Sequence, residues 1–102
     1  MTLAEFVELF DECGIPIAFD HFRTEQSLPY LVYIVAANEQ FAADNITFHS
    51  TPDLQLELYT DQKDPTKEAV VENIISGFFY TKEEGYLDSE QMYMVAYRFA
   101  LQ

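Results

Sequence analysis

The sequence predicts an α+β domain in which two helices pack against a mostly antiparallel sheet, in the order α-β-β-β-β-α-β-β. Apolar residues recur at three- and four-residue intervals in two segments, which is typical of amphipathic helices. In several other segments apolar and polar residues alternate, which is typical of strands. The 102 residues, 49% of them hydrophobic, provide for one core, so we expect residues 1–102 to form a single domain.

The N-terminal segment combines a helix start with an apolar stripe. Thr2 and Glu5 have the spacing of a capping box, and the apolar positions after them recur at helical intervals and stop before Gly14. Residues 3–12 should therefore form a short amphipathic helix. Alternation over residues 17–22 suits a first strand.

The middle of the chain predicts three further strands. Pro29 precedes a run of β-branched and aromatic residues, 30–35, that would occupy both faces of a strand, which favours a central position in the sheet over an edge. Residues 38–45 should form a loop and residues 46–49 a short strand. Residues 54–59 alternate regularly between leucine and polar or tyrosine side chains, so we expect a strand with one face in the core.

A second helix should begin at Asp64. An aspartate can accept hydrogen bonds from the free N–H groups of the first turn, and the fixed φ of Pro65 suits the first helical position. Gly77 lies where a C-cap is expected. We expect this helix to cover the sheet with the apolar stripe formed by Val70, Val71, Ile74, Ile75 and Phe78.

The last quarter of the chain predicts a hairpin. Its first strand should comprise residues 78–82, with a turn at residues 83–85. The return strand begins either at Tyr86 or after Glu90. Alternation over residues 92–101 predicts a strand long enough, at about 3.3 Å per residue, to cross the whole sheet.

Charge and composition exclude several classes of function. The chain has 18 acidic and 5 basic residues, a net charge of −13, which disfavours direct binding to nucleic acid or to an anionic membrane. One cysteine excludes an internal disulfide, and the N-terminus lacks the pattern of a signal peptide. No apolar run approaches the roughly 20 residues that cross a bilayer. We therefore expect a soluble, intracellular protein.

The sequence offers little support for catalysis. Cys13 follows Asp11 and Glu12 at the end of the predicted first helix, where negative charge opposes a thiolate, so we interpret it as structural. His21 and His49 are far apart and have no second ligand at metal-binding spacing, so we interpret them as ordinary strand residues. We expect no enzymatic activity, no cofactor and no metal.

The aromatic residues favour self-association. All seven tyrosines fall on predicted strands or their ends, where they either fill the core or contribute to an interface. A central strand that is apolar on both faces, together with an aromatic last strand, supplies more apolar surface than two short helices can cover. We expect copies of the chain to associate. The tyrosines are Tyr30, Tyr33, Tyr59, Tyr80, Tyr86, Tyr93 and Tyr97.

Four segments, in their order and spacing, carry a family resemblance. They are Leu28-Pro29-Tyr30 with Val32-Tyr33, Phe41 with Ala43-Asp44-Asn45, Glu57-Leu58-Tyr59-Thr60 with Lys63-Asp64-Pro65 and Glu68, and Tyr86-Leu87-Asp88 before Met92-Tyr93-Met94-Val95-Ala96-Tyr97. Over roughly residues 28–99 the chain resembles the tail terminator, or tail completion, proteins of long-tailed phages and prophages of Gram-positive bacteria. The first 27 residues match only in having a helix and a strand, and Ala42 stands where the family often has a second aromatic residue.

This resemblance implies a structural, non-catalytic subunit. Such a subunit forms a hexameric ring at the head-proximal end of the tail tube, stops tube polymerisation and meets the head connector. The implied partners are further copies of the chain, the tail tube protein and the head connector protein. The implied location is the tail-head junction of the virion, after synthesis in the bacterial cytoplasm. An acidic channel wall would keep passing DNA from adhering, so we expect the acids on loops away from the seams between subunits.

Two sets of residues are candidates for partner binding. Phe41, Asp44 and Asn45 lie on a predicted loop that combines an aromatic with polar residues; the alternative is that Phe41 packs into the core and the other two shape a turn. The second set would form an acidic rim facing the channel or the tail, or merely a solvated surface. Its members are Asp61, Glu83, Glu84 and Asp88.

Two other functions remain open at this point. A small acidic protein can act as a DNA mimic that occupies the basic groove of a host defence nuclease, and charge alone does not separate a mimic from a ring subunit. A mimic would work as a monomer or dimer, whereas a terminator must form a ring. A host-encoded stress or immunity protein of similar fold is the third reading.

Overall fold

A computed structural model describes residues 1–35 and 53–101 of the chain. The predicted α+β class, with two helices and a mostly antiparallel sheet in the predicted order, is confirmed. The loop expected at residues 38–45 and the strand expected at residues 46–49 lie outside the described residues. The described elements are α1 (Leu3–Glu8), β1 (Ile17–Phe19), β2 (Tyr30–Val35), β3 (Asp53–Thr60), α3 (Pro65–Ile74), β4 (Tyr80–Leu87) and β5 (Met92–Ala100).

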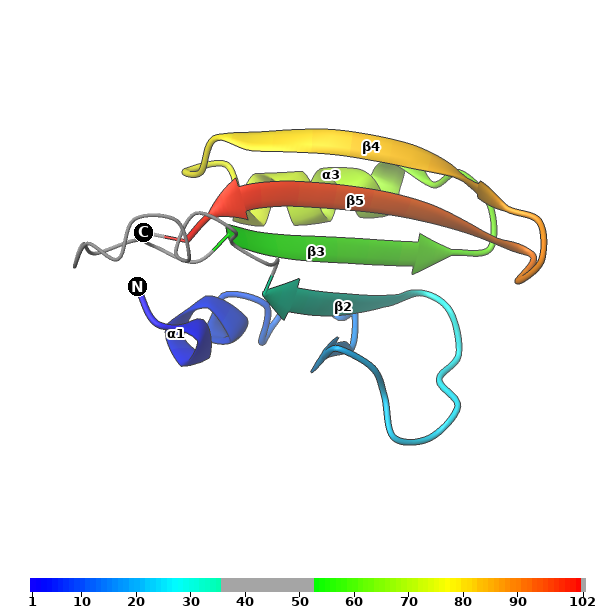
Figure 1. Cartoon of the computed structure of the whole chain (residues 1–102), viewed down its shortest axis with the longest axis horizontal. Coiled ribbons are helices and arrows are strands. Elements are labelled where there is room, and N and C mark those ends of the chain that lie inside the picture. The colour runs from blue at the N-terminus through cyan, green and yellow to red at the C-terminus, as the bar shows by residue number, and fades with distance from the viewer. Residues whose placement is uncertain (36–52, 102) are drawn as a thin grey trace, which may run out of the picture.

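The sheet has five strands in the order β1-β2-β3-β5-β4 (Figure 1). β1 pairs with β2 in parallel, and the other pairs are antiparallel. β2 therefore lies between two strands, which confirms the central position predicted for its apolar run. β5 pairs along its length with β3 on one side and β4 on the other, as its predicted length required. All seven tyrosines lie on strands, as predicted.

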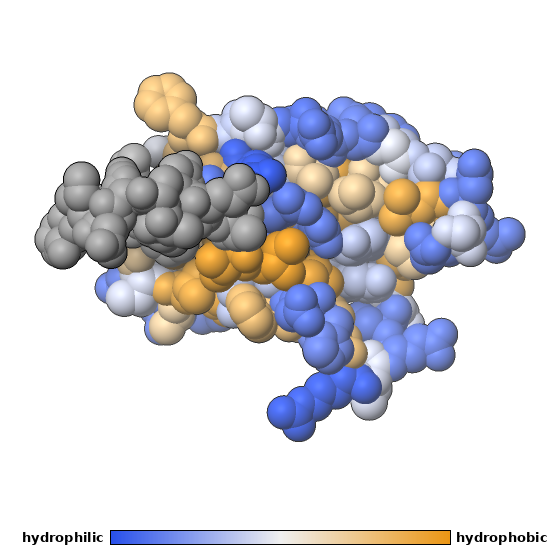
Figure 2. Space-filling view, in the orientation of Figure 1, coloured by the Kyte–Doolittle hydropathy of each residue, from blue (hydrophilic) through white to orange (hydrophobic). Residues whose placement is uncertain are grey.

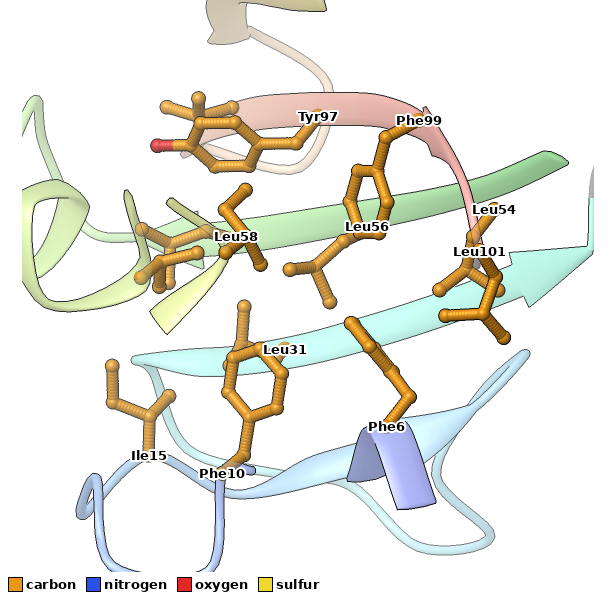
Figure 3. Close-up of a cluster of buried hydrophobic side chains, with 13 residues drawn as sticks. Phe6, Phe10, Ile15, Leu31, Leu54, Leu56, Leu58, Tyr97, Phe99 and Leu101 are labelled. Atoms are coloured by element: carbon orange, nitrogen blue, oxygen red, sulfur yellow. The ribbon is translucent and has the colours of Figure 1, made fainter. Parts of the chain in front are cut away.

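Both helices pack on the same face of the sheet. α1 contributes Phe6, and α3 contributes Val71 and Ile75, to one buried cluster that also contains the alternating leucines of β3 (Figure 3). The leucines of β3 are fully buried, while the residues between them are half-buried, so the strand has one face in the core, as predicted. The remaining members of the cluster are Phe10, Ile15, Leu31, Val95, Tyr97, Phe99 and Leu101.

Both predicted helix starts are confirmed. The Thr2 hydroxyl accepts a hydrogen bond from the Glu5 N–H at 3.1 Å, and the Thr2 N–H donates to Glu5 Oε1 at 2.8 Å, which completes the capping box. Asp64 Oδ1 accepts from the Lys67 N–H at 3.1 Å, and Pro65 follows at the first helical position. These hydrogen bonds satisfy donors that have no partner within the helix.

The first two elements end earlier than predicted. α1 stops at Glu8, and the chain continues in turns until Gly14, whose φ of +82° is a conformation that favours glycine. β1 stops at Phe19 because Asp20 takes a φ of +66°, which turns the chain away from the sheet. His21 is consequently an exposed loop residue and not the strand residue we expected.

The later boundaries also need correction. α3 ends with Ile75 as its C-cap, two residues before Gly77. The predicted turn at residues 83–85 is wrong, because β4 continues to Leu87 with these residues inside it. The chain reverses at residues 88–91, so of the two predicted starts of the return strand the later one is right. Alternation is hard to recognise in β4 because most of its side chains are exposed.

Candidate interaction surface

Neither α1 nor α3 covers the opposite face of the sheet, and we call it the open face. In Figure 1, α3 lies behind the strands, so the viewer looks onto the open face. Strand register and alternation place on it Tyr30, Val32 and Ile34 of β2, Gln55, Glu57 and Tyr59 of β3, Met92, Met94, Ala96 and Arg98 of β5, and Thr81 and Glu83 of β4.

The open face is partly apolar. Figure 2 shows a band of hydrophobic atoms over β2, bordered by hydrophilic atoms. Most side chains of the open face are half-buried, and the rings of Tyr30 and Tyr59 pack at a centroid distance of 5.2 Å. Away from this face, Phe79 projects between α3 and β4 with its side chain 99% exposed. A contiguous apolar band is typical of surfaces that meet other proteins, whereas a single exposed ring is common on any protein surface.

A loop comprising residues 20–29 borders the open face where β2 begins. The Phe22 ring meets the Tyr30 ring edge to face at 5.4 Å, which anchors the loop on the sheet. Between the loop and the strands lies a cavity of about 400 Å³, which we call the loop cleft. Its walls include Glu25, Glu57 and Tyr59, so the cleft combines carboxylates with aromatic rings.

On the helix side, two lysines connect α3 with β4. Lys82 Nζ lies 2.9 Å from Glu68 Oε1 and 2.7 Å from Glu72 Oε2. Lys63 Nζ lies 2.9 Å from the same Glu68 oxygen and also contacts Glu84. The Glu68 side chain is only 5% exposed, so the two ammonium groups compensate a buried carboxylate. We call this the lysine-glutamate network.

Two tyrosines complete the network. The Tyr97 hydroxyl donates to Glu72 at 2.8 Å, and the Tyr93 hydroxyl donates to Glu84 at 2.6 Å. Hydrogen bonding to Lys82 holds the pKa of Glu72 below its ordinary value, and hydrogen bonding to Lys63 does the same to the pKa of Glu84. Burial, followed by the bond to Glu72, raises the pKa of Tyr97, so this hydroxyl remains a donor.

Sequence reasoning missed this network, although the spacing of its members is a usable signal. Glu68 and Glu72 are four residues apart and therefore share one face of the helix. Lys82 and Glu84 are two apart and share one face of the strand. Only the pairing of that helix face with that strand face had to come from the tertiary structure.

The four residues expected in an acidic rim do not share one surface. Asp61 and Asp88 are exposed, and they follow β3 and β4 at the same end of the sheet (Figure 1). Glu83 is exposed on the open face, whereas Glu84 faces the helix side and contacts Lys63. Glu83 and Glu84 lie within β4 and not on a loop, contrary to our expectation for the acids.

The other candidate residues are Cys13, which the structure describes, His21, which lines the loop cleft, and four that the structure does not describe. Phe41, Asp44 and Asn45, as well as His49, lie outside the described residues. Cys13 is half-buried, and its Sγ accepts a hydrogen bond from the Ile15 N–H at 3.4 Å. Within residues 1–35 and 53–101, no three histidine, cysteine or acidic side chains are placed to hold a metal ion. None of the described helices has the length and apolar character needed to span a membrane.

Comparisons of the chain with protein-family models, with curated proteins and with solved structures find no match. The surfaces themselves therefore carry the argument about function. They are the open face with its loop cleft, the exposed Phe79 and the acidic end of the sheet beyond β3 and β4.

Proposed function

We propose that the chain is a structural subunit that assembles with copies of itself into a ring and terminates the tail of a long-tailed phage or prophage. In this role it caps the head-proximal end of the tail tube and joins the tail to the head connector. The observation that carries the proposal is the open face, because neither α1 nor α3 covers its apolar side chains. The resemblance over residues 28–99 gives the assembly its biological setting.

A closed ring needs two different surfaces that fit each other. The apolar band of the open face, to which the half-buried Ile34 and Met94 belong, supplies the first. Phe79 supplies a compact apolar projection for the second, since almost its whole side chain is available for burial in a neighbouring copy. Burying such side chains contributes about 25 cal/mol per Å² of apolar surface removed from water.

The net charge opposes this assembly and determines its salt dependence. Every copy carries a charge of −13, so neighbouring copies repel each other. Asp61 and Asp88 lie at one end of the sheet, away from the apolar band, so they can flank a central channel without entering a seam. Near physiological ionic strength, salt screens charges that are more than about 8 Å apart. Added salt should therefore weaken the repulsion between copies and favour the ring.

The direct test is the oligomeric state over a salt series, measured by light scattering after size-exclusion chromatography. We expect the fraction of oligomer to rise with salt and to fall in an Ile34→Asp variant. Thr81→Asp is the matched control, because it adds the same charge to an exposed position on β4 of the same face. A second arm deletes the gene from its phage. Micrographs of particles with normal tail length and normal head attachment would overturn the proposal.

A second candidate is the DNA mimic, and one observation favours it. Three exposed acidic residues lie just beyond the ends of β3 and β4 and form an acidic tip. They are Asp61, Asp88 and Glu90. In that case the chain would remain monomeric or dimeric at every salt concentration, and it would inhibit a defence nuclease by competing with DNA. Charge-neutral variants of the three residues would abolish inhibition and leave the oligomeric state unchanged.

A further inference from the structure

The loop cleft has the composition of a cation site. Asp20, Glu25 and Glu57 bring three carboxylates to its walls, and the only basic side chain in the described lining is that of His21, whose Nδ1 lies 2.8 Å from Asp20 Oδ2. The cleft differs in this respect from the lysine-glutamate network, where each carboxylate is in contact with a lysine. Glu25 and Glu57 have no lysine or arginine beside them among the described lining residues, so these two carboxylates attract a positive group from outside.

The aromatic walls specify what kind of cation fits. The rings of Phe22, Tyr30 and Tyr59 form a continuous series, with centroid distances of 5.4 Å and 5.2 Å. Ring faces attract organic cations, and a planar guanidinium stacks on them better than a compact, strongly hydrated ammonium does. A bare metal ion gains little from such walls.

Glu57 is held in position to receive the cation. Its Oε1 accepts a hydrogen bond from the Tyr59 hydroxyl, and its Oε2 accepts one from Gln55 Nε2, both at 2.7 Å. Burial, together with the bond to Glu57, raises the pKa of Tyr59, so the hydroxyl stays protonated and keeps donating. Each carboxylate oxygen can accept a further hydrogen bond, so both remain available to a bidentate donor.

We propose that the loop cleft binds the guanidinium group of an arginine side chain on a protein partner, stacked on the tyrosine rings and paired with Glu57. A protein is the source we favour over a free small cation, because the cleft shares Tyr30, Val32 and Met92 with the open face, whose apolar side chains a polypeptide can cover. The polypeptide that carries the arginine has a surface there on which to lie. The proposal does not depend on ring formation or on a phage origin.

The test is titration of the ¹⁵N-labelled protein with a short capped peptide containing one arginine, followed by NMR. The comparison peptide carries citrulline, which has nearly the same shape without the charge. Salt is kept high enough to screen the general attraction of a chain with charge −13. We expect the arginine peptide to shift resonances of Tyr30, Tyr59 and their neighbours, and the citrulline peptide to cause no shift.

Variants separate the cleft from the overall charge. Glu57→Gln keeps the size of the side chain and should weaken arginine binding about tenfold or more, since a charged hydrogen bond is lost. Glu83→Gln removes the same charge from the open face outside the cleft and should leave binding unchanged. Should Glu57→Gln fail to fold, Tyr30→Leu removes a stacking ring and should weaken binding in the same assay.

Each other outcome contradicts the proposal. Equal shifts with arginine and citrulline, or equal losses in the Glu57 and Glu83 variants, would mean that the peptide recognises general features of the surface. Agmatine, which is a free guanidinium compound, binding as tightly as the peptide would mean that the cleft is a small-molecule site. No shift with the arginine peptide up to its solubility limit would mean that the cleft does not recognise guanidinium.

Discussion

Glu68 illustrates, at the scale of one residue, how this acidic chain tolerates a buried carboxylate. Lys63 and Lys82 both contact its Oε1, while its Oε2 is buried and accepts no hydrogen bond within the described part of the chain. Two of the five basic residues are thus committed to one glutamate and its neighbours. Removing either lysine would leave a buried charge poorly compensated.

We expect Lys82→Met to destabilise the fold by about 1–2 kcal/mol, because it leaves Glu68 with one ammonium group instead of two and removes the ammonium group that contacts Glu72. The free energy of unfolding in urea measures the effect. Lys67→Met is the control, since it removes the same charge from α3 and no described carboxylate lies within ion-pair distance of that lysine. Equal losses in the two variants would show that net charge, and not the network, matters.

The network should also give stability a dependence on pH. The pKa of Glu72 is held below its ordinary value of about 4.5, chiefly by the hydrogen bond to Lys82. A lowered carboxyl pKa contributes stability that is present above the ordinary value and is lost as the pH falls through the lowered one. The difference in unfolding free energy between wild type and Glu72→Gln should therefore be full at pH 7 and shrink in acid. A difference that stays constant between pH 7 and acid would contradict this dependence.

Sequence reasoning succeeded for residues whose partners are close in the chain. The hydrogen bonds of Thr2 and Asp64 join residues three apart, so spacing alone predicted them. It missed the contact of Lys63 with Glu84, 21 residues away, because such a pair exists only once α3 and β4 are placed on the sheet. Glu84, which we had placed in an acidic rim, therefore pairs with a lysine that spacing could not identify.

At the scale of elements, β4 shows how an exposed edge strand resembles a turn. Lys82, Glu83, Glu84 and Gly85 have the polarity typical of a turn, yet they pair in register with β5. An edge strand needs little apolar surface, and charged side chains protect it from pairing with other chains. Polarity alone therefore could not separate these two structures.

Gly85 and Gly14 provide a matched test of this assignment. Gly85 lies in β4 with open space where a Cβ would be, so Gly85→Val should stabilise the fold by about 0.5–1 kcal/mol. Gly14 has equal space but a φ of +82°, so Gly14→Ala should destabilise it by about 1 kcal/mol. Thermal unfolding measures both changes. Destabilisation by Gly85→Val would indicate that the chain turns at residues 83–85.

For the whole molecule, the two faces of the sheet should respond differently to truncation. Leu56 is fully buried beneath the helices, and Leu56→Ala should cost about 2–5 kcal/mol of unfolding free energy. Ile34 is half-buried on the open face, so Ile34→Ala should cost about 1 kcal/mol or less and act mainly on self-association. Urea unfolding and sedimentation velocity separate the two effects. A large stability loss in the Ile34 variant would place that residue in the core of the monomer.

Fold class followed from the sequence because each periodicity is a local property of helix or strand. The choice of one sheet face for both helices did not follow, because alternation in β3 distinguishes two faces without saying which elements cover them. The loop cleft could not be predicted either. Its walls come from residues 20–28, 30–32, 57–59 and 92, which only the strand order brings together.

The parallel pairing of β1 with β2 explains why that recess exists at all. Two parallel neighbours require the chain to return to the end of the sheet where the first strand began, and residues 20–29 make this return as an arch beside the open face. α1 and α3 pack on the other face of the sheet, so the arch does not meet them there. The hollow beneath the arch is therefore a consequence of chain path, and substitutions in its lining would alter its chemistry while the hollow itself persists.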